Sequence, residues 1–360
     1  MKFRSLILLL VLFPLSFSCD EGNKPDPIPP PSSQTPGNED GGKKDDDDGT
    51  PKPWDANRGK VVRPEAGNGW TVTSIDGSGV VYYNFEGKEP VSHANQRIFV
   101  TDIDLNDASY QVKLAYYAKG TTASKVFKGT GALACINCGY EKAALYIVID
   151  GSVISTITAD TIGSTGVPQW KSEAALYMDN ERDVRIEFTG EGMNLAQWRA
   201  TYSKRAKSET YMITSAPMLI DDYKPVGIDF CTLHPLASSG PNCSENPYVH
   251  QASTSNPRTA IAKTEDNHVL FIVVDGRRDI SRGISAAELT NFLVKNFNPQ
   301  YALNLDGGGS STMCVKGQGD PTTNVVNYPT DSDEVNPRPG PGDHTGERSR
   351  DTYLYVVKKQ

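Results

Sequence analysis

The chain has 360 residues, of which 37% are hydrophobic and 9% aromatic, and its formal net charge is −8. This composition excludes a multi-pass membrane protein, a collagen-like chain and a fully disordered chain. Residues 1–18 carry two basic residues and residues 19–55 carry ten acidic and four basic ones, which leaves −4 for residues 56–360. No broad basic surface is implied, so the sequence argues against a nucleic-acid partner bound through its phosphates.

The first eighteen residues have the organisation of a lipoprotein signal peptide. Lys2 and Arg4 precede an apolar run over residues 6–15, and the short segment 16–18 leads into Cys19. An apolar run of about ten residues is too short to span a bilayer. The cysteine at this place resembles a bacterial lipobox, so we expect cleavage before Cys19 and its acylation. The alternative is an ordinary cleaved signal with Cys19 free or paired.

Residues 19–55 are predicted to form an extended tether. Eight prolines and the acidic run at 45–48 fall in this segment, with almost nothing apolar to bury. Such a segment cannot offset the entropy lost on ordering. The acidic run also lacks the ligand spacing of a calcium loop. We therefore expect a protein anchored in the bacterial cell envelope through its N-terminal lipid, outside the cytoplasm, at the outer membrane or cell surface.

From residue 56 the sequence predicts an α+β fold with strand-rich mixed sheets and few helices. Apolar runs separated by turn residues predict strands. These runs cover residues 80–85, 97–105, 110–117, 144–149, 184–188 and 268–274. Ser285 and Glu288 form a capping-box pattern ahead of a helix over residues 286–296. We expect a β-rich segment over residues 56–97 and the main domain over residues 98–360, with one large domain as the alternative.

A strand–helix–strand unit carries the most informative residues. The strand at 268–274 ends in Asp275-Gly276-Arg277, and the strand at 301–305 ends in Asp306, three glycines and three hydroxyl residues. If the crossover is right-handed, this βαβ unit has parallel strands. Both aspartates would then lie at the same edge of the sheet, where open α/β sheets bind ligands.

These residue types suit cleavage of a bond at the anomeric carbon of a sugar. One carboxylate can attack or activate water, while a second protonates the leaving group or stabilises positive charge. A glycine-rich turn brings backbone N–H groups close to an anion, and neighbouring hydroxyls add donors. The lysine of a nucleotide-binding GxxxxGK[ST] loop is missing here. A phosphate held at this place would be a good leaving group.

Five cysteines follow Cys19, and their odd number leaves at least one thiol free. Cys231 and Cys243 bracket a loop rich in Pro, Ser and Gly, and outside the cytoplasm we favour a disulfide between them. We expect Cys314 to be a buried free thiol. Cys135 and Cys138 have zinc-site spacing, but no second ligand pair accompanies them, so we predict no metal site.

The segment Asn304-Leu305-Asp306-Gly307-Gly308-Gly309-Ser310-Ser311-Thr312-Met313 resembles the signature of the phosphodiester glycosidase family. Further motifs of the family follow its order within residues 98–357, at residues 215–219, 256–260, 274–277 and 346–348. The asparagine-glycine-glycine-tyrosine-phenylalanine motif usual in the family is altered to Asn137-Cys138-Gly139-Tyr140-Glu141. The cysteine and the glutamate therefore change one wall of the site.

The resemblance implies a hydrolase that cleaves a sugar-1-phosphodiester, similar to a GlcNAc-1-phosphodiester, on cell-surface or environmental glycans, with no required cofactor. Asp275 and Asp306 would be the acid/base or nucleophilic pair, with no choice made between them, and Arg277 and Glu347 complete the catalytic set. The implied substrate-binding residues are Asn137, Arg258, Thr259, Asn304, Gly308, Gly309, Ser310, Ser311, Thr312 and Arg348. Among these, the arginines would clamp a phosphate or carboxylate, and residues 308–311 would form an anion nest.

Other interpretations of the same residues remain open. A carbohydrate-binding surface lipoprotein would use the pocket without turnover, although the presence of both aspartates favours an enzyme. A serine hydrolase would need a GxSxG elbow or an ordered Ser/Asp/His set, and neither is present. A divalent cation bound between Asp275 and Asp306 is compatible with their charge, but no third carboxylate has ligand spacing. Arg348 alone could equally form an exposed salt bridge.

Overall fold

The computed structural model describes residues 52–77, 79–158, 161–162, 167–168, 170–179, 182–190, 195–228, 254–331 and 343–359. These residues belong to one compact unit that begins at Pro51. Cys19, Cys231 and Cys243 lie outside the described residues, so the lipid anchor and the disulfide stay predictions. In the described part of the chain, no helix has both the length and the apolar character needed to cross a membrane.

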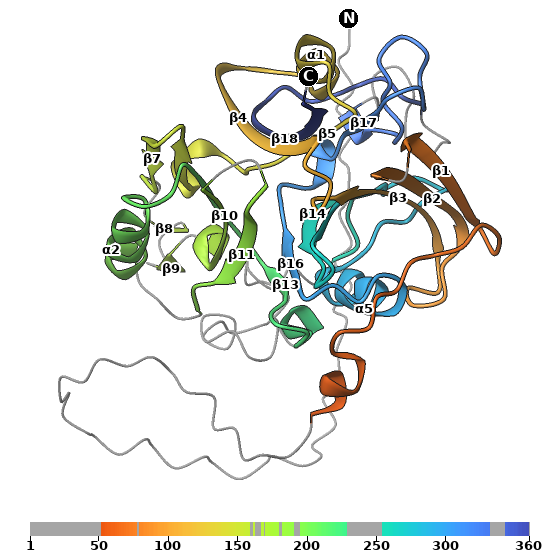
Figure 1. The fold of residues 1–360 in the computed structure, drawn as a ribbon, viewed down its shortest axis with the longest axis horizontal. Helices are drawn as coiled ribbons and strands as arrows, with labels where there is room; N and C mark the ends of the chain where they lie inside the picture. Colours follow the sequence, from red (N-terminus) through yellow and green to blue (C-terminus); the bar gives the residue numbers. More distant parts are fainter. Residues whose placement is uncertain are drawn as a thin grey trace, which may run out of the picture. The chain divides into compact units, whose positions relative to one another are not determined.

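A seven-stranded sheet runs through the middle of the fold (Figure 1). Its strands, in spatial order, are β1 (Trp70–Asp76), β2 (Val80–Lys88), β3 (Asn95–Asp104), β15 (His268–Val274), β14 (Arg258–Lys263), β16 (Tyr301–Asn304) and β13 (Met218–Ile220). Every pairing in this sheet is antiparallel. The predicted boundary between residues 97 and 98 falls inside β3, so residues 70–97 share a sheet with the rest of the domain.

Among the residues that the structure describes, the other β structure consists of two further sheets and a short strand pair. The five-stranded sheet contains β11 (Val184–Phe188), β10 (Ala174–Met178), β12 (Tyr211–Ser215), β6 (Tyr146–Ile149) and β7 (Ser152–Thr156). The four-stranded sheet contains β17 (Met313–Val315), β5 (Ala134–Asn137), β18 (Arg350–Lys358) and β4 (Tyr110–Thr121). The short pair is β8 (Thr161–Ile162) with β9 (Val167–Pro168). The predicted strand-rich α+β class is confirmed.

Helices are few among the described residues. The α-helices are α1 (Ala123–Thr130), α2 (Leu195–Arg205) and α5 (Ala286–Asn296). The 3-10 turns are η1 (Pro53–Asn57), η2 (Lys142–Ala144), η4 (Trp170–Ser172), η5 (Val226–Ile228) and η6 (Gly308–Ser310). The bounds of α5 agree with the prediction, and its capping box forms, because Ser285 Oγ accepts from the Glu288 N–H at 3.2 Å.

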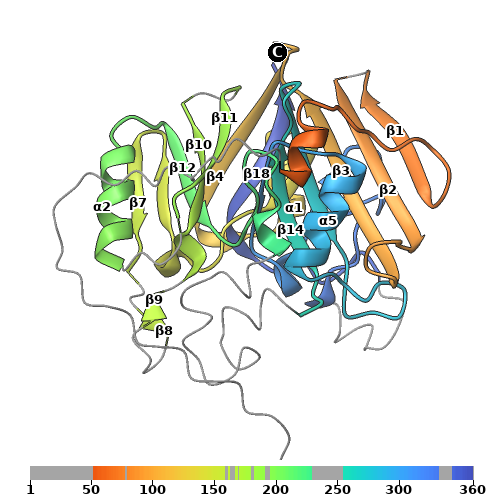
Figure 2. The ribbon, with the colours of Figure 1, turned by 90° about the horizontal axis from the view of Figure 1, so that it is seen from below.

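Helix α5 packs on the large sheet in front of β14 and β3 (Figure 2), and it contacts β13 and η5 as well as the aromatic residue Trp70 of β1. Its Phe292 ring stacks on Trp70 with the centroids 6.0 Å apart, and Phe297, which follows the helix, meets Tyr83 edge-on at 5.7 Å. Aromatic contacts of this kind add to the free energy of apolar burial. They fix the position of the helix that links the end of β15 to the start of β16.

The strands β15 and β16 run in the same direction but are not direct neighbours. Both pair antiparallel with β14, which lies between them. Continued past the strand ends, the register places Asp306 beside Arg258 and Asp275 beside Pro257. Adjacent positions along a strand face opposite sides of a sheet. The two aspartates therefore share an edge of the sheet, as predicted, but face opposite sides of it.

Cys314 and Cys135 lie opposite each other in β17 and β5 of the four-stranded sheet. Both thiols are free and buried, and so is that of Cys138. Burial raises the pKa of Cys314 well above its usual value, which keeps the thiol neutral. The prediction that Cys314 is a buried free thiol is confirmed.

Asp275 joins the end of β15 to the segment that follows β17. Its side chain is buried, and its Oδ1 accepts from Asn327 Nδ2 at 3.1 Å. The backbone N–H of Tyr328 donates to both carboxylate oxygens at 3.0 Å. Burial raises the pKa of Asp275 to about 7, although these hydrogen bonds and the charges of Arg97 and Arg278 oppose that shift. Asp275 therefore links two segments of the fold.

Replacing Asp275 by Asn should remove a pH dependence of stability. Because the pKa is about 7 when folded and roughly 3.9 when unfolded, the group favours the folded state at low pH. This contribution is lost as the pH rises through about 7. From pH 5 to pH 8, the free energy of unfolding of the unmodified protein should fall by about 2 kcal/mol relative to Asp275→Asn.

Urea unfolding at the two pH values measures this difference. Asp279→Asn, which changes an exposed carboxyl four residues further along, is the matched control and should keep the pH dependence of the unmodified protein. An identical pH dependence in Asp275→Asn and the unmodified protein would contradict the role given to Asp275.

Candidate active site

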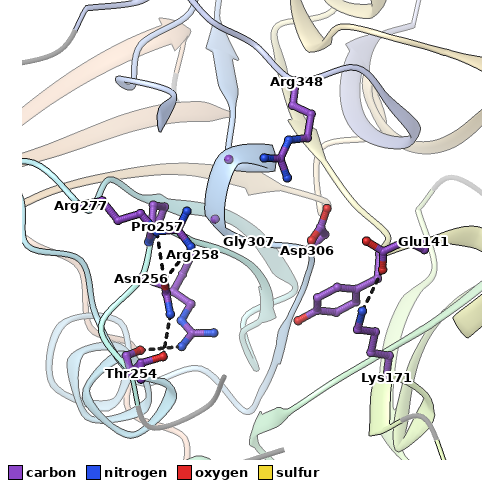
Figure 3. A pocket seen from close by; sticks show the side chains of 13 residues that line it. Glu141, Lys171, Thr254, Asn256, Pro257, Arg258, Arg277, Asp306, Gly307 and Arg348 are labelled. Carbon is purple, nitrogen blue, oxygen red and sulfur yellow. Dashed lines mark hydrogen bonds and ion pairs between the residues drawn. The ribbon is translucent and has the colours of Figure 1, made fainter. Parts of the chain in front are cut away.

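A pocket of about 330 Å³ opens where β16 ends and β14 begins. This volume lies at the lower end of the range for small-molecule sites. The pocket is lined by Tyr140, Glu141, Lys171, Thr254, Asn256, Pro257, Arg258, Arg277, Asp306, Gly307, Gly308, Gly309 and Arg348. Figure 3 shows that Asp306 lies between the arginines on one side and the Glu141–Lys171 pair on the other.

Asp306 is the buried carboxylate of this pocket. Its backbone N–H donates to Cys138 O at 2.9 Å, which fixes the chain as it leaves β16. Its Oδ2 lies 3.1 Å from Nε of Arg350. Burial raises the pKa of Asp306 to about 6, and the Arg350 charge and the Ser310 hydroxyl oppose that rise. A carboxyl with this pKa changes its protonation state close to neutral pH.

The three glycines after Asp306 bring the chain against residues that a side chain would displace. A Cβ at Gly307 would lie 2.7 Å from Pro257 O, and one at Gly309 would lie 2.4 Å from Nη2 of Arg348. Gly308 has a φ of +64°, in the left-handed region that favours glycine. Glycine is therefore needed at positions 307 and 308, whereas a side chain at position 309 would displace the ends of the Arg348 and Asp331 side chains.

The backbone N–H groups of this loop are largely used within the fold. Gly308 N–H donates to Pro257 O at 2.9 Å, Ser310 N–H to Gly307 O at 3.3 Å, and Ser311 N–H to Gly308 O at 3.2 Å. Of the anion nest predicted over residues 308–311, the N–H groups of Gly308, Ser310 and Ser311 are therefore already used, by Pro257 and by the turn η6. Charge complementarity for an anion comes from side chains instead.

The three predicted arginine clamps converge on this pocket. Arg258 is buried, and its guanidinium donates to Ile284 O at 3.0 Å and Thr254 O at 2.9 Å. Burial lowers the pKa of Arg258 to about 10, which still leaves it charged at neutral pH. Both Nε and Nη2 of Arg277 donate to Asn256 Oδ1, at 3.2 and 2.8 Å.

Two details of the arginines bear on their role. Arg277 has a backbone φ of +61°, which residues other than glycine, asparagine and aspartate rarely adopt. Such outliers gather at functional sites, and here the outlier directs the guanidinium toward Gly308. Arg348 forms a two-point ion pair with Asp331 at 2.7 and 3.0 Å and also lines the pocket. Arg348 therefore forms a salt bridge and also lines the pocket, so the two interpretations of this residue do not exclude each other.

Several predicted substrate-binding residues instead form one hydrogen-bonded group beneath the pocket. Asn137 Nδ2 donates to Asp306 O at 2.6 Å, and its Oδ1 accepts from Thr259 Oγ1 at 2.9 Å and Thr312 N–H at 3.1 Å. Thr259 Oγ1 also lies 3.2 Å from Ser311 Oγ, and since its proton goes to Asn137 it accepts from the Ser311 hydroxyl. These residues are buried and do not line the pocket, so they hold the backbone of Asp306 in place.

Asn304 and Tyr140 connect the end of β16 to the opposite wall. Asn304 Nδ2 donates to Tyr140 Oη at 2.8 Å, and Tyr140 Oη donates to Ala216 O at 2.9 Å. Ser310 and Thr312, predicted to offer hydroxyl donors to a ligand, are buried and are not among the residues that line the pocket.

Asp275 and Glu347, two predicted catalytic residues, do not line the pocket. Glu347 accepts from the Ser124 N–H at 2.8 Å and from its hydroxyl, so it lies at the start of α1. Neither Asp275 nor Asp306 is among the causes of the other's pKa shift. Burial is the main cause that raises the pKa of each of these two aspartates.

Sequence reasoning missed part of the pocket. Lys171 comes from η4 and belongs to no motif. Arg350, the ion-pair partner of Asp306, lies two residues after Arg348, which ends the motif at residues 346–348. The departure at Glu141 from the family pattern was the one signal that pointed to this wall. Among the described residues, no group of three or more His, Cys, Asp or Glu side chains is arranged to hold a metal ion.

Comparisons with known proteins agree with the fold and the motifs. The zebrafish N-acetylglucosamine-1-phosphodiester alpha-N-acetylglucosaminidase catalytic domain, auto-inhibited by its pro-peptide, matches with a TM-score of 0.53 and 15% identity. That match covers 83% of this chain and 87% of the zebrafish chain. A hypothetical protein from Synechocystis matches with a TM-score of 0.47 and 10% identity, over 82% of this chain and 64% of that one.

The zebrafish likeness, at this identity, shows a shared fold. No curated protein sequence matches this chain. The family model for phosphodiester glycosidases matches residues 131–354, which is more than half of the chain and includes β5, β14, β16 and the glycine loop. The resemblance seen in the sequence motifs is thereby confirmed, and the chain belongs to the phosphodiester glycosidase family.

Proposed function

We propose that this protein hydrolyses a sugar-1-phosphodiester at the anomeric carbon, releasing the sugar and leaving the phosphate on its other partner. One observation carries the proposal: a buried carboxylate, Asp306, shares a pocket with the guanidinium groups of three arginines. An ordinary glycoside offers no anion to such a set of cations. A phosphodiester offers one next to the carbon that reacts.

The arginine side of the pocket is suited to hold the phosphate. Arg258 stays charged at neutral pH despite burial, and arginine recognises phosphate oxygens through its planar set of donors. Arg277 and Arg348 are held by Asn256 and Asp331, so their positions are fixed before a ligand binds. Fixed charges lose little conformational entropy on binding, which favours both affinity and orientation.

Hydrolysis breaks the bond between the anomeric carbon and the bridging phosphate oxygen. The electron pair of that bond leaves on the phosphate, and oxygen from water becomes the new substituent of the sugar. Because a phosphate monoester has a second pKa of about 6, it departs as a stable anion without a proton from the enzyme. Asp306 therefore acts as a carboxylate, either as the base for water or as a nucleophile that water later displaces.

Replacing Asp306 by Asn should lower kcat on sugar-1-phosphodiesters by at least about a hundredfold, the lower end of the contribution of a positioned acid or base. Because the carboxylate is the active form, kcat/KM of the unmodified protein should rise with pH through about 6 and be lost below it. Initial rates on sugar-1-phosphodiesters and on ordinary glycosides, measured across pH, test both points.

The ordinary glycosides should react slowly or not at all. Asp275→Asn is the matched control, since it changes a buried aspartate outside the pocket, and it should retain activity at pH 6. Near-full activity in a folded Asp306→Asn variant would contradict the mechanism.

Replacing Arg277 by Lys should weaken phosphate binding by about tenfold, the loss of roughly one charge-assisted hydrogen bond. Lysine keeps the charge but not the two-point geometry with which Nε and Nη2 meet Asn256. Competitive inhibition by inorganic phosphate measures this change. Arg282→Lys, an exposed arginine paired with Glu288 outside the pocket, should leave the inhibition constant unchanged. Equal effects in both variants would show that Arg277 does not hold the phosphate.

The signal segment and the tether support a location in the bacterial cell envelope, with the domain attached to a membrane through acylated Cys19. The motivation is the short apolar run directly before this cysteine. In detergent partitioning, the unmodified protein should enter the detergent phase, and Cys19→Ser should be soluble or unprocessed. Membrane association that survives Cys19→Ser would exclude the anchor.

A further inference from the structure

The wall opposite the arginines has a different chemistry. Glu141 and Lys171 form an ion pair with 2.8 Å between Oε2 and Nζ, and Lys171 Nζ lies 4.5 Å from the centre of the Tyr140 ring. Resting on the proposed function, we propose that Glu141 and Lys171 form the sugar-binding half of the pocket and hold the sugar through its free hydroxyl groups.

The distribution of charge separates the two halves. Figure 3 shows Arg258 and Arg277 across the pocket from Glu141 and Lys171, with Asp306 between them. The Glu141–Lys171 pair has no net charge, whereas the arginine side is cationic, and this difference directs the phosphate to the arginine side. The neutral part of the substrate is then left facing Glu141 and Lys171, with its anomeric carbon toward Asp306.

The ion pair has hydrogen-bonding capacity left for a ligand. The Glu141 side chain is 65% exposed and that of Lys171 is 14% exposed. Burial raises the pKa of Glu141, but the hydrogen bond and the charge of Lys171 lower it, and the net direction is down. Glu141 is therefore a carboxylate at neutral pH and can accept hydrogen bonds. A carboxylate has about four acceptor sites and an ammonium group three donors, and one contact between them uses only part of these. A sugar hydroxyl, which both donates and accepts, suits such a pair.

The surrounding residues hold this wall in place. Tyr140 is buried and its hydroxyl bonds to Ala216 and Asn304, so the ring under Lys171 has a fixed position. The Glu141 end of this ion pair is open to solvent while Lys171 is largely covered, and both residues line the pocket, where a ligand can reach them.

Position 141 is also where the sequence departs from the phenylalanine of the usual family motif. The charged pair offers hydrogen-bond donors and acceptors at this wall. We therefore expect this protein to prefer sugars that turn free hydroxyls toward residue 141.

Calorimetric titration of the full mature protein tests this inference without relying on turnover. The probes are inorganic phosphate and the 1-phosphates of glucose, galactose, mannose and N-acetylglucosamine. For the unmodified protein, the best sugar 1-phosphate should bind at least about tenfold more tightly than inorganic phosphate, the size of roughly one hydrogen bond to a charged group. We call the ratio of these two affinities the gain from the sugar. Glu141→Ala and Lys171→Met should each lose this gain while keeping the Kd of inorganic phosphate within about twofold.

Lys142→Met is the matched control, because Lys142 contacts Tyr116 outside the pocket and should leave the gain unchanged. Thermal unfolding of each variant shows whether it is folded. The inference is overturned if no sugar 1-phosphate binds more tightly than inorganic phosphate. It is equally overturned if the two pocket variants keep the gain, or if they weaken inorganic phosphate as much as the sugar 1-phosphate.

Turnover measured in parallel separates this inference from the proposed function. Loss of the gain in both pocket variants, without turnover of any sugar-1-phosphodiester, would support the sugar-binding half and exclude the hydrolase. Turnover by the unmodified protein, with an unchanged gain in both variants, would support the hydrolase and exclude the sugar-binding half.

Discussion

The site depends on the hydrogen bonds made by the buried side chain of Asn137. Its amide reaches the carbonyl of Asp306, the hydroxyl of Thr259 and the backbone N–H of Thr312. It therefore ties β5 to β14 and to both ends of the glycine loop in one buried group. Loss of such a group would leave several buried polar atoms without partners, which is costly in a low-dielectric interior. The position of Asp306 thus follows from a contact between different sheets.

Burial and charge then determine what the pocket can do. Asp306 lies near cations, yet its pKa is raised to about 6, because burial outweighs the charge of Arg350. The arginines on one side attract an anion, while the Glu141–Lys171 pair on the other is close to neutral overall. A substrate with an anionic part and a hydroxyl-rich part fits this division. The carboxylate lies where the two parts would be joined.

Much of the fold was predictable because its signals are local. The strand at 268–274, the helix at 286–296 and its capping box follow from periodicity and from Ser285 and Glu288 alone. The motif around Asp306 likewise indicated the glycine loop, and the other family motifs indicated the three arginines that line the pocket. These residues lie next to strand ends, so residues that are close together along the chain are also close together in the structure.

The other features of the site depend on which strands pair with each other, and the spacing of motifs along the sequence does not show this. The strand β14 inserts between β15 and β16, and the resulting register turns Asp275 and Asp306 to opposite sides of the sheet. Asp275 therefore bonds to Asn327 and Tyr328, outside the pocket. Lys171 comes from the five-stranded-sheet region and Glu347 lies at the start of α1, and neither position follows from a local pattern.

The central claim is that one pocket divides into a phosphate half and a sugar half on either side of Asp306. A crystal structure of the Asp306→Asn variant with an uncleaved sugar-1-phosphodiester tests this claim most directly. The account predicts the phosphate against Arg258 and Arg277, the sugar ring against Glu141, and the anomeric carbon next to residue 306. A phosphate on the Glu141 side, or a ligand bound outside this pocket, would contradict it.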